Sequence, residues 1–216
     1  MRTGIAFLLA AALVLPRADA EPMAPQSSDR LVELVRPIAL YPDALLAQVF
    51  AASMHPDEVM EAERWLEQHR RLNPQELAQA VDGQAWDPGV KALTQFPALL
   101  EEMSLNRSST AALGDAYASA PRELLRTVQT LRRRAQASQS LASTRAQRVL
   151  TDGWDIMIDP IDPTRIELPG GPVHEIGGSI RYLWAWYGWD VDWRQGVAMY
   201  HGVPHLWIAP ETAAQF

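Results

Sequence analysis

The sequence contains no cysteine among its 216 residues. This absence excludes a disulfide framework, and it excludes a lipid-anchored lipoprotein, because such a protein needs a cysteine at its cleavage site. It also excludes a reactive thiol, and the sequence has no serine-elbow motif either. Nothing in the chain therefore supports acyl transfer as its chemistry.

Long hydrophobic runs are also scarce. The run from Gly4 to Leu15 is uncharged, but it is only about a dozen residues long, whereas a membrane span needs about 20. It follows Met1-Arg2 and is soon followed by the small residues of Ala18-Asp19-Ala20. This order is typical of a secretory signal peptide that is cut after Ala20, with an uncleaved anchor as the alternative.

Basic residues are fewer than acidic ones: 19 Lys and Arg face 26 Asp and Glu, for a net charge of −7. Loss of the signal peptide would remove two arginines and one aspartate, which leaves 17 basic and 25 acidic residues and a net charge of −8. Nucleic acids require a basic footprint, so we expect no nucleic-acid partner. The hydrophobic fraction of 48% is sufficient for a core, and the length suits one domain or one domain with a small appendage.

Proline marks the start of several expected helices between residues 29 and 135. It fits the first helical position because that amide has no partner in the helix and because its fixed φ suits the helix. Apolar residues recur at helical spacing, as in Val90, Leu93 and Leu100, and Pro97 is expected to divide this stretch. The sequence thus predicts a mainly α fold, a compact bundle of short helices. The five starts are at Pro42, Pro56, Pro74, Pro88 and Pro121.

Two motifs are too particular to be explained by helix formation alone. The first is PIALYPDALLAQV, from Pro37 to Val49, and the second is WDPGVKAL, from Trp86 to Leu93, with Phe96-Pro97 after it. Together they resemble a bacterial exported family known as domain of unknown function 3300, closely over residues 31–141 and loosely over residues 154–169. In this second region, family members tend to have a segment that ends in tyrosine, valine and proline, whereas this chain has Ile166-Glu167-Leu168-Pro169. The resemblance implies export, and it implies no reaction or ligand.

The residues of these motifs are interpreted as structural, with a binding role as the alternative. Tyr41 would cover the core at a corner between two helices, with its hydroxyl bonded to backbone, and Trp86 would do the same before its helix. Asp43 is expected to cap its helix, and the sequence suggests no acid or base partner for it. The motif residues are Tyr41, Pro42, Asp43, Trp86, Asp87 and Pro88.

The character of the sequence changes after Arg132-Arg133-Arg134. Residues 135–148 are rich in Ala, Ser, Gln and Arg, with Leu141 as the one large apolar residue. One interpretation of these arginines is a basic patch for an anionic envelope component. We favour the other, a solvated helix whose arginines suit its negative C-terminal end. The range 136–152 is accordingly predicted to be a linker or an exposed helix.

After residue 152 the apolar period changes from helical to alternating. Trp154, Ile156 and Ile158 occupy every second position, and two prolines then mark a turn before a returning strand at residues 165–169. Six of the eight tryptophans lie between Trp154 and Trp207, so this region is aromatic-rich. The sequence predicts a small antiparallel β appendage. Its further strands are expected at residues 182–186, 189–193, 199–201 and 206–208.

These patterns divide the chain into parts of different character. Removal of the signal peptide would leave a soluble mature chain, periplasmic or secreted, with no transmembrane span. The expected parts are residues 1–20 (signal peptide), 21–28 (flexible N-terminus), 29–135 (α-helical domain of unknown function), 136–152 (linker or exposed helix) and 153–216 (aromatic-rich β region).

Three histidines lie near one another in the sequence but lack a metal-binding motif. His174-Glu175 has no second histidine at the spacing of a zinc-protease helix, and Gly-Val-Pro between His201 and His205 prevents the helical geometry that would bring both to one metal. A site made of all three histidines is the alternative. We favour solvated or core histidines, and we therefore expect no metal and no cofactor.

The exposure of the tryptophan rings bears on the function of the protein. Rings exposed in a row would stack on a ligand, whereas rings that face inward would form core. We expect a non-enzymatic exported cell-envelope protein, a binding or scaffold module whose partner is an envelope protein or a glycan. The alternative is a cell-wall polysaccharide hydrolase or another carbohydrate-active enzyme, with Asp190 and Asp192 as a carboxylate pair in a tryptophan-lined groove. The four candidate binding residues are Trp184, Trp186, Trp189 and Trp193.

Overall fold

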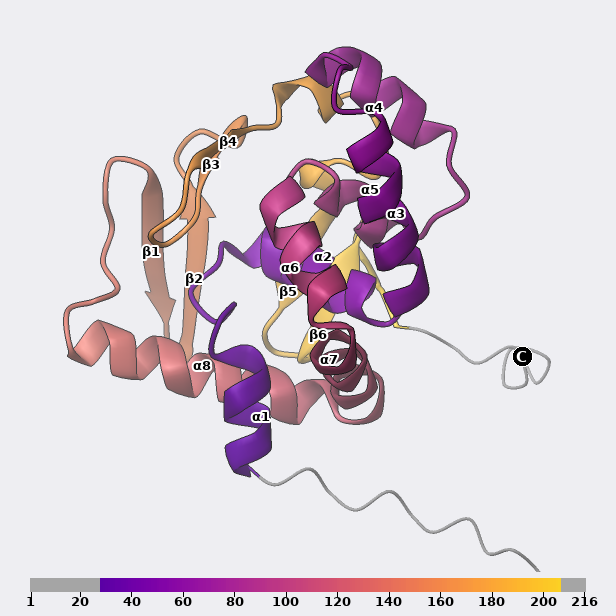
Figure 1. The fold of residues 1–216 in the computed structure, drawn as a ribbon. Helices are drawn as coiled ribbons and strands as arrows, with labels where there is room; N and C mark the ends of the chain where they lie inside the picture. Colours follow the sequence, from indigo (N-terminus) through magenta and orange to yellow (C-terminus); the bar gives the residue numbers. More distant parts are fainter. Residues whose placement is uncertain (1–27, 207–216) are drawn as a thin grey trace, which may run out of the picture.

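The computed structural model describes residues 28–206, in which eight α-helices precede seven short β-strands. Figure 1 shows α2 to α7 gathered in a bundle, α8 along one side of it, and strands β1 to β4 together at one end. The prediction of a mainly α fold with a small antiparallel β appendage is confirmed. The expected signal peptide, residues 1–20, and the expected flexible segment up to residue 27 lie outside the described residues.

The elements have the following bounds. The helices are α1 (Ser28–Val35), α2 (Asp43–Ser53), α3 (Pro56–Gln68), α4 (Pro74–Asp82), α5 (Pro88–Leu93), α6 (Pro97–Leu105), α7 (Arg107–Ser119) and α8 (Pro121–Ala137). The strands are β1 (Gln147–Asp152), β2 (Asp155–Pro160), β3 (Arg165–Glu167), β4 (Val173–Glu175), β5 (Trp189–Asp192), β6 (Val197–Tyr200) and β7 (Val203–Pro204), and the short 3₁₀ helices are η1 (Gly177–Ser179) and η2 (Trp186–Gly188). Within residues 28–206, no helix has the length and apolar character that a membrane span requires.

Helix α2 is the centre of the bundle, and its sequence explains why. DALLAQVFAAS has almost no polar face, and every one of its residues except Ala44 is buried. A helix that is apolar all round must be surrounded, and α3, α5, α7, β5 and β6 all pack on it. Helix α7 approaches it closely at Gly114, where a side-chain carbon would lie 2.2 Å from the carbonyl oxygen of Ser53. This contact therefore requires glycine.

The proline signals predict most helix starts correctly. Helices α3, α4, α5 and α8 begin at the four expected prolines, and Pro97 begins α6 and so separates it from α5. Pro42 differs, because its ψ of 147° is extended; it lies just before α2 as the N-cap residue, and Asp43 is the first helical residue. The helical part of the sequence is thus organised by local backbone chemistry.

The strands form three small antiparallel sheets, β1–β2, β3–β4 and β5–β6–β7. The strands expected at residues 154–158 and 165–169 correspond to β2 and β3, but they do not pair with each other. Strand β2 pairs with β1, with Val149 opposite Ile158, and β3 pairs with β4. The range 136–152, predicted to be a linker or an exposed helix, therefore holds the end of α8, a loop and all of β1. Strand β1 is largely exposed and polar, so its sequence has little strand signal.

One further strand prediction is wrong. Residues 182–186 form turns that lead into η2, held by hydrogen bonds such as Ala185 N–H to the Tyr182 carbonyl oxygen at 3.1 Å. The last described strand is β7, which follows a reversal of the chain at His201 and Gly202, whose φ angles are 48° and 76°. The strand expected at residues 206–208 stays a prediction, because its last two residues are not described. The expected residue Ile208 lies outside the described part of the chain.

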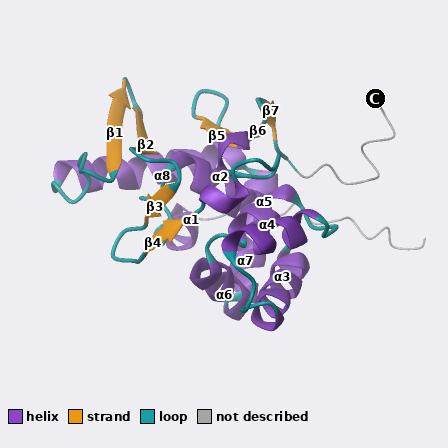
Figure 2. Cartoon of the chain, turned by 90° about the horizontal axis from the view of Figure 1, so that it is seen from above, coloured by secondary structure: helices purple, strands orange, loops and turns teal. Residues whose placement is uncertain are grey.

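The β region is divided between two hydrophobic clusters. Trp189, Val191 and Ala198, from β5 and β6, belong to the core of the helical bundle. Ile156 and Ile158, from β2, pack instead with Leu141 in a separate small cluster. Figure 2 shows β1 to β4 on one side of the molecule and α3 to α7 on the other, although Ile166 of β3 belongs to the main core. The last sheet is thus part of the main domain.

Candidate functional site

A buried ion pair joins the first motif to α8. Arg132 is 0% exposed and Asp43 is 3% exposed, and the Arg132 Nη1 atom lies 2.6 Å from the Asp43 Oδ1 atom. The sequence interpretation placed Arg132 at a solvated helix end and Asp43 as a helix cap, and the structure corrects both points. Arg132 is buried, and the Asp43 carboxylate accepts hydrogen bonds from Arg132, Ile158 and Trp193, while Pro42 is the N-cap residue of α2. The missed signal is helical spacing, because Arg132 follows Leu124 and Val128 at intervals of four on the buried face of α8.

Backbone carbonyl groups accept three further hydrogen bonds from the Arg132 guanidinium, so that four of its five N–H groups are bonded. Because these carbonyls come from the corner before α2 and from β2, a single side chain connects three segments that are distant in sequence. A buried guanidinium is tolerated when each of its nitrogens is hydrogen-bonded and its charge is paired. The acceptors are the carbonyl oxygens of Ala39 at 2.8 Å, Tyr41 at 2.8 Å and Ile156 at 2.7 Å.

Asp43 also accepts hydrogen bonds from the β region. Its Oδ1 atom accepts the Ile158 amide at 3.2 Å, and its Oδ2 atom accepts the indole N–H of Trp193 at 2.7 Å. Burial raises the pKa of the Asp43 carboxyl, while the Arg132 charge and these hydrogen bonds oppose that rise. The first motif thus fixes the start of α2 to α8, to β2 and to the ring that follows β5.

Trp193 links this buried cluster to the surface. Its ring packs against the core, with the guanidinium carbon of Arg132 4.8 Å from the ring centroid. It also lines a cavity of about 420 Å³ between α8, the β1–β2 turn and the β5–β6 turn. We call this cavity the arginine groove. Its charged and aromatic lining residues are Arg122, Arg126, Arg133, Arg194, Asp155, Trp154 and Trp193.

Trp154 is the exposed ring of the arginine groove, with 76% of its surface accessible. The guanidinium carbon of Arg133 lies 3.7 Å from its ring centroid, and the same guanidinium donates to the carbonyl oxygens of Trp154 at 3.1 Å and Gly153 at 3.3 Å. The sequence interpretation treated Trp154 as a strand residue. It lies instead in the two-residue turn between β1 and β2, where Gly153 has a φ of 59°. The glycine before Trp154 was the sequence signal from which this turn could have been predicted.

Three of the four candidate tryptophans are buried and do not form an exposed row. Trp184, Trp186 and Trp189 are 3%, 7% and 4% exposed and belong to the main core. Trp184 donates its indole N–H to Asp82 at 3.0 Å, and Trp189 donates to the carbonyl oxygen of Trp184 at 3.0 Å. Among these four rings, Trp193 is the one that lines the arginine groove.

A second groove, of about 640 Å³, adjoins the first at Trp193 and contains the proposed carboxylate pair, Asp190 and Asp192. Asp192 is engaged in a turn, since its two oxygens accept the amide and the side chain of Gln195, each at 2.8 Å. Asp190 accepts the amide of Val191 at 2.7 Å. The two acids lie on the same face of β5, as alternating acids on the outer face of a strand commonly do. The two carboxylates of a glycosidase instead flank the substrate from two sides.

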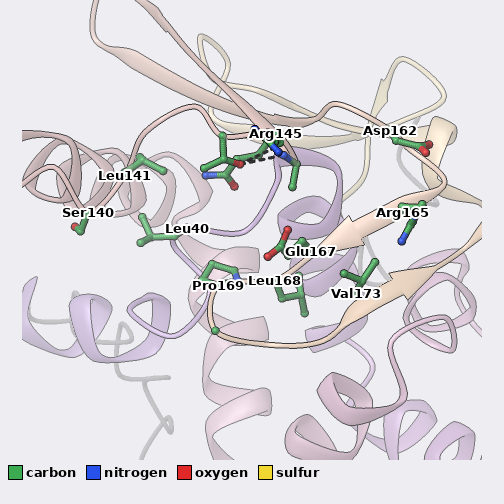
Figure 3. A pocket seen from close by; sticks show the side chains of 14 residues that line it. Leu40, Ser140, Leu141, Arg145, Asp162, Arg165, Glu167, Leu168, Pro169 and Val173 are labelled. Atoms are coloured by element: carbon green, nitrogen blue, oxygen red, sulfur yellow. Dashed lines mark hydrogen bonds between the residues drawn. The ribbon is translucent and has the colours of Figure 1, made fainter.

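A third cavity, of about 580 Å³, lies between the loop after α8 and the β3–β4 hairpin. Figure 3 shows Leu40 and Leu141 at one end of it and Asp162 and Arg165 at the other, with Glu167 between them. Its charged residues are of both signs, and none of the described residues that line it is aromatic. It therefore offers less to select a ligand than the arginine groove does.

The aromatic residues of the two motifs lie where helices meet. Tyr41 is half-buried against the main core, and Pro42 beside it is buried. Trp86 is buried before Pro88, the first residue of α5, and contacts Trp65 edge-on with ring centroids 5.7 Å apart. Large rings at such junctions stabilise the packing of short helices.

Asp87, in the second motif, caps α5 and contacts two histidines. Its Oδ1 atom accepts the Gly89 amide at 2.7 Å, and its Oδ2 atom lies 3.1 Å from the His205 Nε2 atom and 3.6 Å from the His55 Nε2 atom. The Asp87 amide donates to Glu58 at 2.6 Å. Burial acts to raise the pKa of Asp87, but the hydrogen bond and charge of His205, the Gly89 amide and His55 outweigh it and hold this pKa below its usual range.

This lowered pKa predicts a pH-dependent effect of Asp87→Asn. Because the folded-state pKa lies below the unfolded value of about 4, the carboxylate stabilises the fold above that pH and loses this effect as pH falls through the folded pKa. We expect Asp87→Asn to lower the free energy of unfolding by about 1–2 kcal/mol at pH 7. Urea unfolding of both proteins between pH 7 and pH 3 measures it. A difference that stays constant down to pH 3 would contradict the assignment.

The three histidines considered as a metal site are dispersed. His174 lies 5.0 Å from Phe96 by ring centroids, a ring nitrogen of His201 lies 2.7 Å from the carbonyl oxygen of Leu183, and His205 contacts Asp87. Within the part of the chain that the structure describes, no group of three or more histidine, aspartate or glutamate side chains is arranged to hold a metal ion. The expectation that the protein uses no metal or cofactor stays a prediction.

Comparisons with known proteins identify relatives of unknown function. A family model described as a protein of unknown function, DUF3300, matches residues 27–208. The uncharacterized protein YacH of Escherichia coli (strain K12) is 38% identical over 184 residues, which are 79% of this chain and 30% of that protein, so the chain spans less than a third of its length. No solved structure shows a significant match. The family match includes every described helix and strand, from α1 to β7. The chain therefore belongs to the DUF3300 family of proteins of unknown function.

Proposed function

We propose that this protein is a non-enzymatic, exported cell-envelope protein that binds a glycan of the envelope through the arginine groove. The observation that carries the proposal is Trp154, an exposed indole held by Arg133 and lining the same cavity as Trp193. Exposed rings of this size serve ligand stacking in many binding sites, because the ring offers a large apolar face to a sugar.

The restraint on Trp154 supports a binding role. Its ring is held by a cation and its backbone by two hydrogen bonds from the same side chain, so little conformational freedom is left to lose on binding. Preorganisation of this kind raises affinity by reducing the entropy lost when a ligand binds. Trp193 is held in turn by its hydrogen bond to Asp43. The buried motif thus acts as the support of the proposed binding surface.

Export rests on the signal-peptide pattern of residues 1–20. The mature protein would begin at Glu21 and would lie in the periplasm or outside the cell. N-terminal sequencing of native protein from fractionated cells tests this, and an intact Met1 on a cytosolic product would refute it.

The glycan proposal predicts separate effects of Trp154→Ala on stability and on binding. We expect the free energy of unfolding to change by less than about 1 kcal/mol, because the ring is exposed. Binding to isolated envelope polysaccharides should weaken at least about tenfold, because a stacking aromatic ring contributes strongly to affinity. Isothermal titration of the mature chain measures the affinity. Tyr187→Ala is the matched control, since Tyr187 is an exposed ring in the second groove.

The second groove is the reason to keep a polysaccharide hydrolase as the alternative. It combines Asp190 with Trp189 and Trp193, so carboxylate and aromatic groups are present together. Against it stands the use of both Asp192 oxygens in a turn. Release of soluble fragments from cell-wall polysaccharide by the mature chain, abolished by Asp190→Asn, would favour the hydrolase; unchanged polymer after prolonged incubation would favour binding.

A further inference from the structure

We propose that the ligand of the arginine groove is an acidic polysaccharide, with its carboxylate or phosphate groups on Arg122, Arg126 and Arg194 and a sugar ring on Trp154. The inference rests on the proposed function and adds the charge class of the glycan. Guanidinium groups bind carboxylate and phosphate oxygens through paired hydrogen bonds, and this geometry is specific to anions of that shape.

The arginines converge on the groove from two sides. Arg122, Arg126 and Arg133 are four and seven residues apart on α8, so they lie along one face of the helix. Arg194 reaches the same cavity from the β5–β6 turn. A cavity with cations on both walls and an exposed ring at its edge is suited to a chain that carries both charge and sugar rings.

The local charge is opposite to that of the whole chain. Four arginines line the groove and one aspartate, Asp155, lines it with them, whereas the chain as a whole has a net charge of −7. A cleft lined by one sign of charge concentrates ligands of the opposite sign. The overall negative charge would meanwhile repel large polyanions from the rest of the surface.

Several guanidinium donors in the groove remain available to a ligand. Arg122 uses its Nε atom, which donates to the Gln195 carbonyl oxygen at 2.9 Å, and this leaves its terminal nitrogens. Arg194 lies 3.9 Å from Asp152, and both side chains are largely exposed, so this pair contributes little. Arg126 is exposed and makes no side-chain hydrogen bond or ion pair with another described residue.

The stability of helix α8 does not account for these positions. Arg122 lies in the first turn of α8, where the positive end of the helix dipole disfavours a cation. The spacing of four between Arg122 and Arg126 also places like charges next to each other, which destabilises a helix. Arg132, by contrast, is buried and paired with Asp43. The exposed arginines therefore have the properties of a binding surface, because an anionic ligand would remove both unfavourable interactions.

Titration of the mature chain with defined polymers tests the inference. The probes are polygalacturonate, a phosphodiester-linked sugar polymer, neutral dextran, and vesicles of phosphatidylglycerol. We expect binding to at least one of the two anionic polymers, weaker at higher salt, and none to dextran. Arg126→Glu and Arg194→Glu should each weaken binding at least about tenfold. Arg134→Glu, the same change on α8 outside the groove, should alter it less than about twofold.

The outcomes separate the inference from the function on which it rests. Equal binding to dextran, lost in Trp154→Ala but unchanged in Arg126→Glu, would overturn the anionic class and leave glycan binding in place. Binding to vesicles alone, lost in Arg126→Glu, would assign the groove to a membrane surface and overturn the polysaccharide. Failure of every polymer and of envelope polysaccharide to bind would overturn both proposals.

Discussion

Replacement of Arg132 by methionine is expected to lower the free energy of unfolding by about 3–5 kcal/mol. The variant leaves the Asp43 carboxylate buried without its cation, and it removes the guanidinium donor from the carbonyl groups of Ala39 and Tyr41. The Ile156 carbonyl also loses this donor but keeps its hydrogen bond from the Gln129 side chain. Methionine fills much of the arginine volume, so the effect reports lost charge and hydrogen bonding more than lost packing. Urea unfolding at pH 7, followed by tryptophan fluorescence, measures the change.

Two further variants make this result specific. Arg134→Met changes an exposed arginine of the same helix and should alter stability by less than about 0.5 kcal/mol. The double variant Asp43→Leu with Arg132→Met replaces the ion pair by apolar side chains and should recover part of the loss, because no charge is then buried alone. A nearly neutral Arg132→Met would mean that the pair does not have the buried geometry described above.

Local signals explain which parts of the fold were predictable. Proline acts on its own residue and its nearest neighbours, so four helix starts and the division at Pro97 followed from sequence alone. The alternation of Ile156 and Ile158 likewise gave β2. Strand β1 has no such pattern, because it is exposed on most of its length and is held by pairing with β2.

The candidate site depended on contacts that no local pattern contains. Asp43 and Arg132 are 89 residues apart, and Asp43 and Trp193 are 150 residues apart. Helical spacing could have placed Arg132 on a buried face, but it could not have named its partner. The prediction that the tryptophans form an exposed row on a strand failed for a related reason. The alternating rings in residues 182–186 suggest a strand, but whether they are buried depends on how the chain packs against the helical core.

Trp189→Ala is expected to lower the free energy of unfolding by about 3–5 kcal/mol, because it removes a large buried ring. The Trp189 ring packs in the main core, with centroids 4.6 Å from Tyr200 and 5.2 Å from His205, and it donates its indole N–H to Trp184. The alanine variant leaves a cavity at the point where β5 and β6 meet α2, and the short sheet there has little other support.

Trp154→Ala is the matched control for this loss, since it removes the same side chain from an exposed turn and should change stability by less than about 1 kcal/mol. Chemical denaturation of the two variants beside the unmodified protein gives both values. A large loss for Trp189→Ala with a small one for Trp154→Ala means that β5 and β6 are held by the core. The core would then fix the position of the β5–β6 turn, which lines the arginine groove. Losses of similar size would mean that Trp154 packs against the fold, and the exposed ring on which glycan binding depends would not exist.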